Sequence, residues 1–245
     1  MKKCCLLLAL GLLPAVFAAD IYLAGDSTMQ PYGEKSRPMT GWGEVLQDFC
    51  KKGVVVYNRA YGGRSSKSFR NEKKWQWIMD RIKPGDFVII QFGHNDAAKG
   101  EKNLYRSTDP EKDYPEYMRK YVRDARAQGA IPVIATQTVI LRRDAQKKQF
   151  NSGSEKKYVA SALRIAAEEK ADVVDLNAIA TEKITAMSIP EGESLYMVFP
   201  AGKYPNWKDG RKDRVHLSEA GAKFYAAEFV KVAKEKGMKI AELFN

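Results

Sequence analysis

Short runs of apolar, mostly β-branched residues recur along the chain, and most of them follow a glycine or a polar turn. Because these runs are continuous instead of alternating with polar residues, they predict strands buried on both faces, as in a parallel sheet. The expected strands cover residues 21–24, 54–57, 87–90, 131–135 and 173–176.

Between these runs, apolar residues return every three or four positions, which predicts helices with one buried face. Trp75, Ile78, Met79 and Ile82 follow this spacing, and Ser218 is a favourable capping residue before the last helix. The expected helices cover residues 43–50, 75–82, 116–128, 155–170 and 218–236.

Strand and helix therefore alternate along the chain, which indicates one α/β domain with helices on both faces of a parallel sheet. No internal repeat or low-complexity linker interrupts this order. The segment 197–214 is rich in Pro, Gly, Lys and aromatic residues, and it is expected to form a long loop. Long ordered loops are often functional.

The N-terminal residues are interpreted as a leader. Lys2 and Lys3 precede an apolar run at 4–19, and Val16 and Ala18 occupy the −3 and −1 positions of a small-residue cleavage site. This pattern is typical of a secretory signal peptide at 1–18, whose removal would leave a single domain at 19–245. An uncleaved N-terminal anchor is the alternative, although the run is short for a membrane-spanning helix.

Composition narrows the possible chemistry. The chain has 245 residues, and 41 Lys and Arg against 30 Asp and Glu give a formal charge of +11. Loss of Lys2 and Lys3 with the leader would lower this charge by two, to +9. Two His cannot form a three-His metal site, and three scattered Cys cannot form a Cys-rich zinc site. Only Cys50 would remain after cleavage, so the mature chain could form no internal disulfide.

Polar residues follow several predicted strands, at the edge of the sheet where α/β proteins bind ligands. Ser27, Gly63 and Asn95 come after the first three strands, and Asp213 and His216 precede the last helix. Singly, the serine could cap a helix, the glycine could form a turn, and the last two could be a surface pair. Together they supply a hydroxyl, hydrogen-bond donors and an imidazole with a nearby carboxylate, which are the parts that acyl transfer to serine requires.

On these residues the chain resembles the SGNH superfamily of GDSL-type hydrolases. It is similar in particular to the rhamnogalacturonan acetylesterase family, in the stretches 22–29, 41–44, 63–65 and 92–96. The first block reads GDST where the general pattern has GDSL. The resemblance implies a flavodoxin-like, three-layer α/β/α sandwich around a five-stranded parallel sheet. The four blocks that carry it are Gly25-Asp26-Ser27, Gly63, Asn95 and Asp213-x-x-His216.

The resemblance also implies a role for each residue. Ser27 would be the nucleophile, His216 the base that takes its proton, and Asp213 the carboxylate that orients the imidazole. The oxyanion hole would consist of the backbone N–H groups of Ser27 and Gly63 and the side-chain amide of Asn95. This mechanism needs neither a cofactor nor a metal.

Neighbouring residues receive no chemical role. The family pattern places the oxyanion glycine directly before Arg-Ser, which selects Gly63 over Gly62. His94 is interpreted as structural, because its neighbour Asn95 occupies the catalytic position. Asp26 and Asp96 are expected to orient the loops that carry the catalytic residues.

The resemblance implies that the substrate is an acetylated pectic polysaccharide, deacetylated in a secreted or periplasmic location. A basic surplus suits an acidic glycan, but a solvated Lys-rich surface explains it equally well. Tyr204 and Trp207 are candidates for stacking on sugar rings, with core packing as the alternative. A secreted chain argues against nucleic acid as a partner, and we expect a monomer without a membrane anchor.

Other functions remain open. The same machinery could deacetylate another glycan, such as xylan or a sialic acid, or could cleave lipid or thioester acyl chains. The polar region 99–114 does not suggest the apolar groove that a long-chain acyl enzyme needs. A non-catalytic glycan-binding protein on the same scaffold is a further alternative, but it would have no need of Ser27, Asp213 and His216 together.

Overall fold

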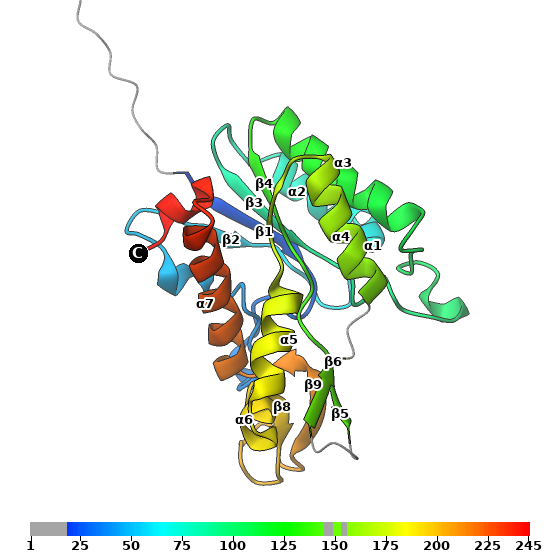
Figure 1. Cartoon of the computed structure of the whole chain (residues 1–245), viewed down its shortest axis with the longest axis vertical. Helices are drawn as coiled ribbons and strands as arrows, with labels where there is room; N and C mark the ends of the chain where they lie inside the picture. The colour runs from blue at the N-terminus through cyan, green and yellow to red at the C-terminus, as the bar shows by residue number, and fades with distance from the viewer. Residues whose placement is uncertain (1–18, 145–148, 153–155) are drawn as a thin grey trace, which may run out of the picture.

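The computed structural model describes residues 19–144, 149–152 and 156–245, and the expected leader at 1–18 lies outside these ranges. A central sheet of five parallel strands has the order β2-β1-β3-β4-β7 (Figure 1). The predicted five-stranded parallel sheet is therefore confirmed. Its strands are β1 (Ile21–Gly25), β2 (Val56–Asn58), β3 (Phe87–Gln91), β4 (Ile131–Ala135) and β7 (Asp172–Val174).

The register of the sheet aligns the carboxyl ends of its first three strands. Leu23 of β1 lies opposite Asn58 of β2, and Gly25 lies opposite Gln91 of β3. The segments that follow these strands therefore leave the sheet at a common edge. The predicted site residues Ser27, Gly63 and Asn95 all belong to these segments.

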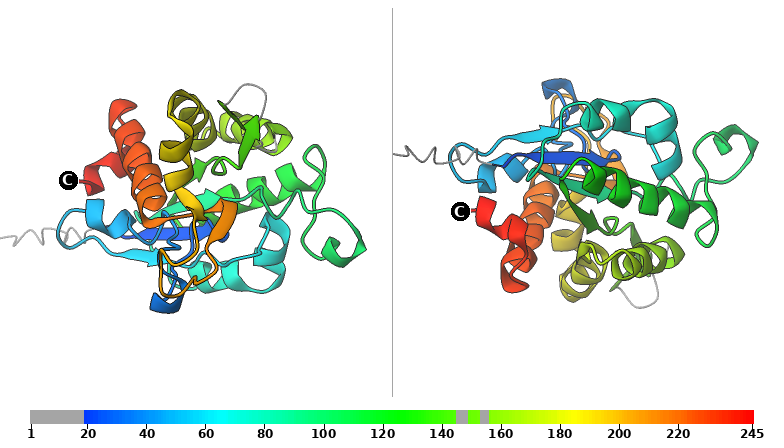
Figure 2. Two further views of the ribbon diagram at one scale, coloured as in Figure 1. Left: turned by 90° about the horizontal axis from the view of Figure 1, so that it is seen from below. Right: turned by 90° about the horizontal axis from the view of Figure 1, so that it is seen from above.

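Helices cover both faces of the sheet, which gives the three-layer sandwich that the resemblance implied (Figure 2). Because side chains alternate along a strand, Tyr22 packs with helices α1 to α4 on one face, and Ile21 packs with α5 and α7 on the other. The helices are α1 (Ser66–Asn71), α2 (Lys74–Met79), α3 (Asp113–Ala127), α4 (Lys156–Glu168), α5 (Leu176–Ala186), α6 (Ile189–Ser194) and α7 (Glu219–Glu235).

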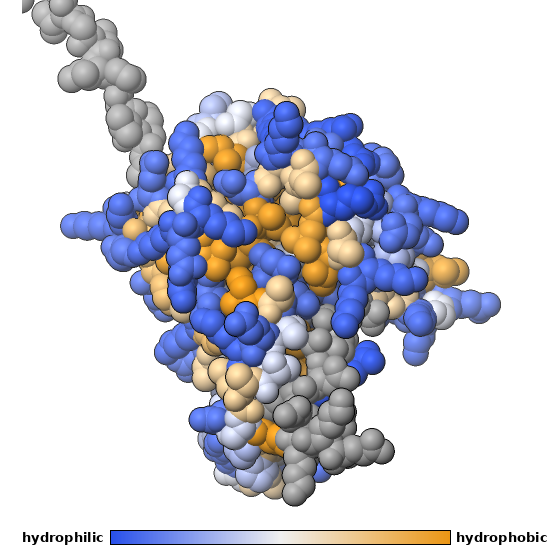
Figure 3. Space-filling model, viewed as in Figure 1, coloured by the Kyte–Doolittle hydropathy of each residue, from blue (hydrophilic) through white to orange (hydrophobic). Residues whose placement is uncertain are grey.

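Some apolar surface is visible on the face where α7, α5 and α4 lie. The space-filling view shows hydrophobic residues in a band between hydrophilic side chains (Figure 3). Such exposure is ordinary, because more than half of a folded protein's surface comes from apolar atoms. Within the described ranges, no helix combines the length and apolar character needed to cross a membrane.

Two predicted elements differ in the structure. The segment 43–50, predicted as a helix, holds only a 3₁₀ helix at Leu46–Phe49. The backbone at the start of this segment packs closely against Met29, since a Cβ on Gly43 would lie 2.7 Å from Met29 Cγ. Leu176 begins α5 instead of ending a strand, because Asp175 caps that helix by accepting a 3.0 Å hydrogen bond from the backbone N–H of Ala178.

The prediction of a long loop at 197–214 is wrong at both ends of that segment, which are strands, and right for residues 200–210 between them. Strands β8 (Tyr196–Phe199) and β9 (Arg211–Leu217) pair as an antiparallel hairpin. The prolines and glycines that suggested a loop lie in the connection at 200–210. A second hairpin, which the sequence analysis did not predict, pairs β5 (Leu141–Asp144) with β6 (Gln149–Ser152).

Buried hydrogen bonds join the β8–β9 hairpin to the body of the fold. The Tyr196 hydroxyl donates to the Val139 carbonyl at 2.9 Å and lies 2.9 Å from the Tyr225 hydroxyl of α7. At the far end of β9, the Thr40 N–H donates to the Leu217 carbonyl at 3.1 Å. The hairpin is therefore fixed to the edge of the sheet where the Ser27 segment emerges.

We expect Tyr196→Phe to lower the free energy of unfolding by about 1–2 kcal/mol, because a buried carbonyl and a buried hydroxyl each lose a partner. Urea unfolding followed by circular dichroism measures the change. Tyr57→Phe is the matched control, since Tyr57 is 37% exposed, and it should change stability by less than about 0.5 kcal/mol. Equal losses in the two variants would contradict the assigned role of the Tyr196 hydroxyl.

Candidate active site

A chain of buried polar side chains supports the turn that carries Ser27. Thr28 Oγ1 donates to Asp26 Oδ1 at 2.8 Å and accepts from Gln91 Nε2 at 3.0 Å. The side-chain amide oxygen Oε1 of Gln91 in turn accepts from the Trp42 indole N–H. These four residues are fully buried, so their hydrogen bonds are shielded from water and fix the backbone beside Ser27.

His216, near the end of β9, lies against Ser27. Its Nε2 is 3.0 Å from Ser27 Oγ, and its Nδ1 is 2.8 Å from Asp213 Oδ2. Because a carboxylate only accepts, the Nδ1 atom carries the proton and Nε2 is left to accept from the serine hydroxyl. The structure thus brings the predicted Ser27, Asp213 and His216 into one hydrogen-bonded chain.

The surroundings of Asp213 keep its carboxyl group ionised. Burial alone would raise its pKa, because desolvation disfavours the charged form. The hydrogen bond and charge of His216, together with the Arg211 guanidinium at 2.8 Å, outweigh burial and hold the pKa of Asp213 well below its usual range. The resulting carboxylate can stabilise a positive charge on the imidazole.

Ser27 and His216 line a pocket of about 560 Å³ that Gly63 and Asn95 also line. The backbone N–H groups of Ser27 and Gly63 donate to no residue of the described ranges, so both are available to a ligand. The φ of Gly63 is +78°, a conformation that favours glycine. All three predicted oxyanion donors therefore meet at one pocket.

The amide of Asn95 is held at both ends. Its Nδ2 donates to the Arg64 carbonyl at 3.1 Å, and its Oδ1 accepts from Arg106 Nη1 at 3.0 Å. Since a guanidinium only donates, the Arg106 contact distinguishes the amide oxygen from the nitrogen. The amide is thus oriented before any ligand arrives, with a second Nδ2 hydrogen that the Arg64 carbonyl does not use.

The two residues beside Asn95 have different surroundings. His94 also lines the pocket, and its Nε2 lies 3.0 Å from Thr138 Oγ1. Asp96 is fully buried and accepts hydrogen bonds from the backbone N–H and hydroxyl of Ser66 and from Thr108 Oγ1. Asp96 thereby joins the start of α1 to the loop at 99–108.

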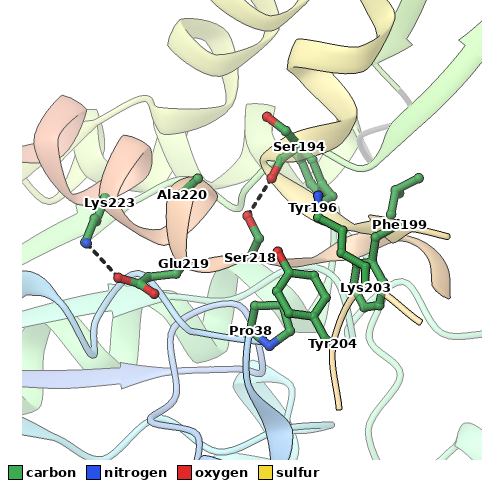
Figure 4. A pocket seen from close by; sticks show the side chains of 11 residues that line it. Pro38, Ser194, Tyr196, Phe199, Lys203, Tyr204, Ser218, Glu219, Ala220 and Lys223 are labelled. Carbon is green, nitrogen blue, oxygen red and sulfur yellow. Dashed lines mark hydrogen bonds and ion pairs between the residues drawn. The ribbon is translucent and has the colours of Figure 1, made fainter. Parts of the chain in front are cut away.

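Tyr204 and Trp207 do not line the Ser27 pocket. Tyr204 packs edge-on against Phe199, with ring centroids 4.7 Å apart, and lines a separate cavity of about 460 Å³ (Figure 4). Trp207 donates its indole N–H to the Arg37 carbonyl at 3.0 Å and lies beneath the Arg211 guanidinium. These contacts correspond to the packing alternative and leave stacking on substrate without structural support.

Two pocket residues escaped the sequence analysis. The Tyr32 hydroxyl donates to the Ser27 carbonyl at 2.8 Å, and burial raises the pKa of this phenol. Arg106 reaches the pocket from the 99–108 loop. Neither residue follows a strand or belongs to a motif, so the sequence offered no signal for them. In the part of the chain that the structure describes, no cluster of His, Cys, Asp and Glu is arranged to hold a metal ion.

Comparison with known proteins shows the family to which the chain belongs. The sequence model of the GDSL-like lipase/acylhydrolase family matches residues 23–224, which include every residue of the pocket chemistry described above. The chain belongs to this family. The match begins inside β1 and ends in α7, so the family region includes the other four strands of the central sheet and most of β1.

Two relatives from Bacillus subtilis (strain 168) are identical to this chain at about a third of the aligned positions. A probable rhamnogalacturonan acetylesterase, YesY, is 35% identical over 226 residues, which cover 92% of this chain and 97% of the relative. The rhamnogalacturonan acetylesterase RhgT is 32% identical over 223 residues, which cover 91% and 93%.

Two solved structures have a fold similar to that of this chain. Protein YxiM of Bacillus subtilis matches with a TM-score of 0.72 at 30% identity, covering 90% of this chain and 57% of that one. Axe2, an acetylxylan esterase from Geobacillus stearothermophilus, matches with a TM-score of 0.61 at 17% identity, covering 87% and 93%. The second likeness supports the fold only.

The buried Asp96 should make the free energy of unfolding depend on pH. Burial raises its pKa to about 7, against the lowering effect of the Ser66 and Thr108 hydrogen bonds. An aspartate in an unfolded chain titrates near pH ~3.9. Between these two pH values Asp96 is protonated in the folded chain and ionised in the unfolded chain. This group should therefore make the free energy of unfolding fall as the pH rises from about 4 to 7.

The variant Asp96→Asn should lose this part of the pH dependence, whatever its absolute stability. Urea unfolding of both proteins across this pH range measures the difference, and subtracting the two curves removes the contributions of all other carboxyl groups. Parallel curves would contradict a protonated Asp96 in the folded chain.

Proposed function

We propose that the chain is a serine esterase that removes O-acetyl groups from acetylated pectic polysaccharide of the rhamnogalacturonan type. The observation that carries the proposal is the continuous hydrogen-bonded chain of Ser27, His216 and Asp213, opening into a pocket with three convergent donors. A glycan-binding protein would need neither the ionised Asp213 nor the 3.0 Å contact between imidazole and hydroxyl.

Acylation begins when Ser27 Oγ attacks the carbonyl carbon of the ester and its proton passes to His216 Nε2. The Asp213 carboxylate stabilises the imidazolium that forms and keeps Nδ1 protonated. His216 then gives the proton to the departing sugar hydroxyl, which leaves an acetyl group on Ser27. Water, deprotonated by the same imidazole, releases acetate and restores the serine.

The negative oxygen of each tetrahedral intermediate receives hydrogen bonds from the Ser27 N–H, the Gly63 N–H and the Asn95 amide. The structure supports this role through the unoccupied backbone donors and the fixed orientation of the amide. Such donors act without reorganisation at the moment of reaction, and each is commonly worth about 10²–10³ in kcat.

The choice of substrate rests on the relatives and on charge. Two relatives that align along nearly their whole length are named as rhamnogalacturonan acetylesterases. The formal charge, +11 for the whole chain and +9 after loss of Lys2 and Lys3, suits a polymer that carries carboxylates. Export directed by residues 1–18 would bring a monomeric enzyme to a polysaccharide that lies outside the cytoplasm.

Ser27→Ala should abolish acetate release from a small aryl acetate, because no other hydroxyl is positioned against His216 in the described structure. Spectrophotometric assay of the released phenol measures this loss. Ser188→Ala is the matched control, since Ser188 lies at the start of α6 and does not line the Ser27 pocket, and it should retain activity. Activity that survives in the Ser27 variant would refute the mechanism.

The substrate is tested with a panel of acetylated polymers. Acetate release should be fastest from acetylated rhamnogalacturonan and slower from acetylated xylan and from O-acetylated sialosides, measured with a coupled acetate assay at equal acetyl concentration. A preference for xylan or sialosides would leave the esterase mechanism intact but overturn the proposed substrate.

A further inference from the structure

Arg106 is the only Arg, Lys, Asp or Glu among the described residues that line the Ser27 pocket. It extends from the 99–108 loop, which projects from the body of the fold (green, at the right of both views in Figure 2). A lone cation at the mouth of a reaction pocket favours an anionic group on whatever binds there.

The guanidinium is held rigidly by neutral oxygens. Its Nε donates to Asn103 Oδ1 at 3.0 Å, and its Nη1 donates to Asn95 Oδ1 at 3.0 Å and to the Gly63 carbonyl at 3.4 Å. No carboxylate in the described ranges pairs with Arg106, and its Nη2 makes no hydrogen bond to a described residue. The side chain is therefore preorganised, half-buried and uncompensated in charge.

The same contacts place the cation next to the reacting ester. Asn95 and Gly63 are the proposed oxyanion donors, and Arg106 touches both of them. An anion bound at Nη2 would thus lie close to the acyl carbon, within the span of one sugar ring or its neighbour. A guanidinium binds carboxylates through directed, charge-assisted hydrogen bonds.

An aromatic side chain lies beside this cation. Tyr105 is 54% exposed, and its ring centroid is 5.7 Å from the Arg106 guanidinium carbon. The loop that presents both residues is anchored, because Lys67 Nζ donates to the Leu104 carbonyl at 2.8 Å and Thr108 bonds to Asp96. An exposed aromatic ring on an anchored loop offers a face on which a sugar can pack.

We propose that Arg106 and Tyr105 form a subsite for a carboxylate-bearing sugar adjoining the acetyl group that Ser27 attacks. The inference rests on the proposed esterase function and deepens it. It assigns preference for acidic glycans to one guanidinium and its neighbouring ring, instead of to the basic surface as a whole. A uronate unit is the ligand class with both a carboxylate and a sugar ring.

A purely structural role for Arg106 makes a different prediction. If the side chain only holds Asn95, its loss slows hydrolysis of charged and neutral substrates by the same factor. A recognition role adds a loss that only the charged substrate shows. The ratio of kcat/KM for two substrates that differ in charge alone therefore separates the two roles.

The test uses an O-acetylated oligogalacturonate with free carboxylates and the same oligosaccharide after methyl esterification, with acetate release as the readout. The wild-type chain should prefer the free acid by about tenfold in kcat/KM, chiefly through a lower KM. Arg106→Gln should reduce that ratio to about one. Arg106→Lys keeps the positive charge but loses the planar guanidinium that can donate two parallel hydrogen bonds, so it should retain part of the ratio. Raising the ionic strength should weaken the wild-type preference.

Lys102→Ala is the matched control, because it removes one positive charge from the same loop at an exposed position outside the pocket. It should keep the wild-type ratio. Tyr105→Ala should raise KM for both oligosaccharides by the same factor and keep the ratio between them, which tests the ring separately from the charge.

The outcomes distinguish the two proposals. A wild-type ratio that persists in Arg106→Gln, or a wild-type chain that hydrolyses both oligosaccharides equally, overturns the subsite while the esterase function stands. Failure of the wild-type chain to cleave any acetate overturns the proposed function. In that case, calorimetric binding of the free acid and the ester to Ser27→Ala, with and without Arg106→Gln, still decides whether Arg106 recognises the carboxylate.

Discussion

The 3.0 Å contact between Ser27 Oγ and His216 Nε2 joins two separately built parts of the molecule. Ser27 is presented by the central sheet, whereas His216 and Asp213 are presented by the β8–β9 hairpin. The hairpin is fixed to the body of the fold by the hydrogen bond that the Tyr196 hydroxyl donates to the Val139 carbonyl and by the one that the Leu217 carbonyl accepts from the Thr40 N–H. The packing of the hairpin on the sheet therefore sets the position of His216 relative to Ser27.

The sheet itself supplies the other half of the site. Parallel strands β1, β2 and β3 end at one edge, and the segments after them bring Ser27, Gly63 and Asn95 to a single pocket. Below that edge, the buried hydrogen bonds of Asp26, Thr28 and Gln91 stiffen the serine turn without contacting the pocket. Rigid donors of this kind suit an enzyme whose main task is to stabilise charge that develops during the reaction.

The parts that the sequence predicted well are those encoded locally. Continuous apolar runs marked β1, β3 and β4, and short polar motifs directly after strands marked the serine and its donors. The hairpin was missed because the prolines and glycines of its connection resemble those of an irregular loop. Arg106 could not be predicted, since its role depends on a contact with Gly63, 43 positions earlier, that only the folded chain creates.

The order of the site residues along the chain has a consequence for synthesis. Ser27 lies near the start of the folded region, and His216 follows it 189 positions later. A ribosome therefore exposes the hydroxyl, Gly63 and Asn95 long before it makes the imidazole and the carboxylate. Chemistry that needs all of these groups can begin only after His216 has been made, so a product that ends before Asp213 would keep the serine hydroxyl without the imidazole that hydrogen-bonds to it.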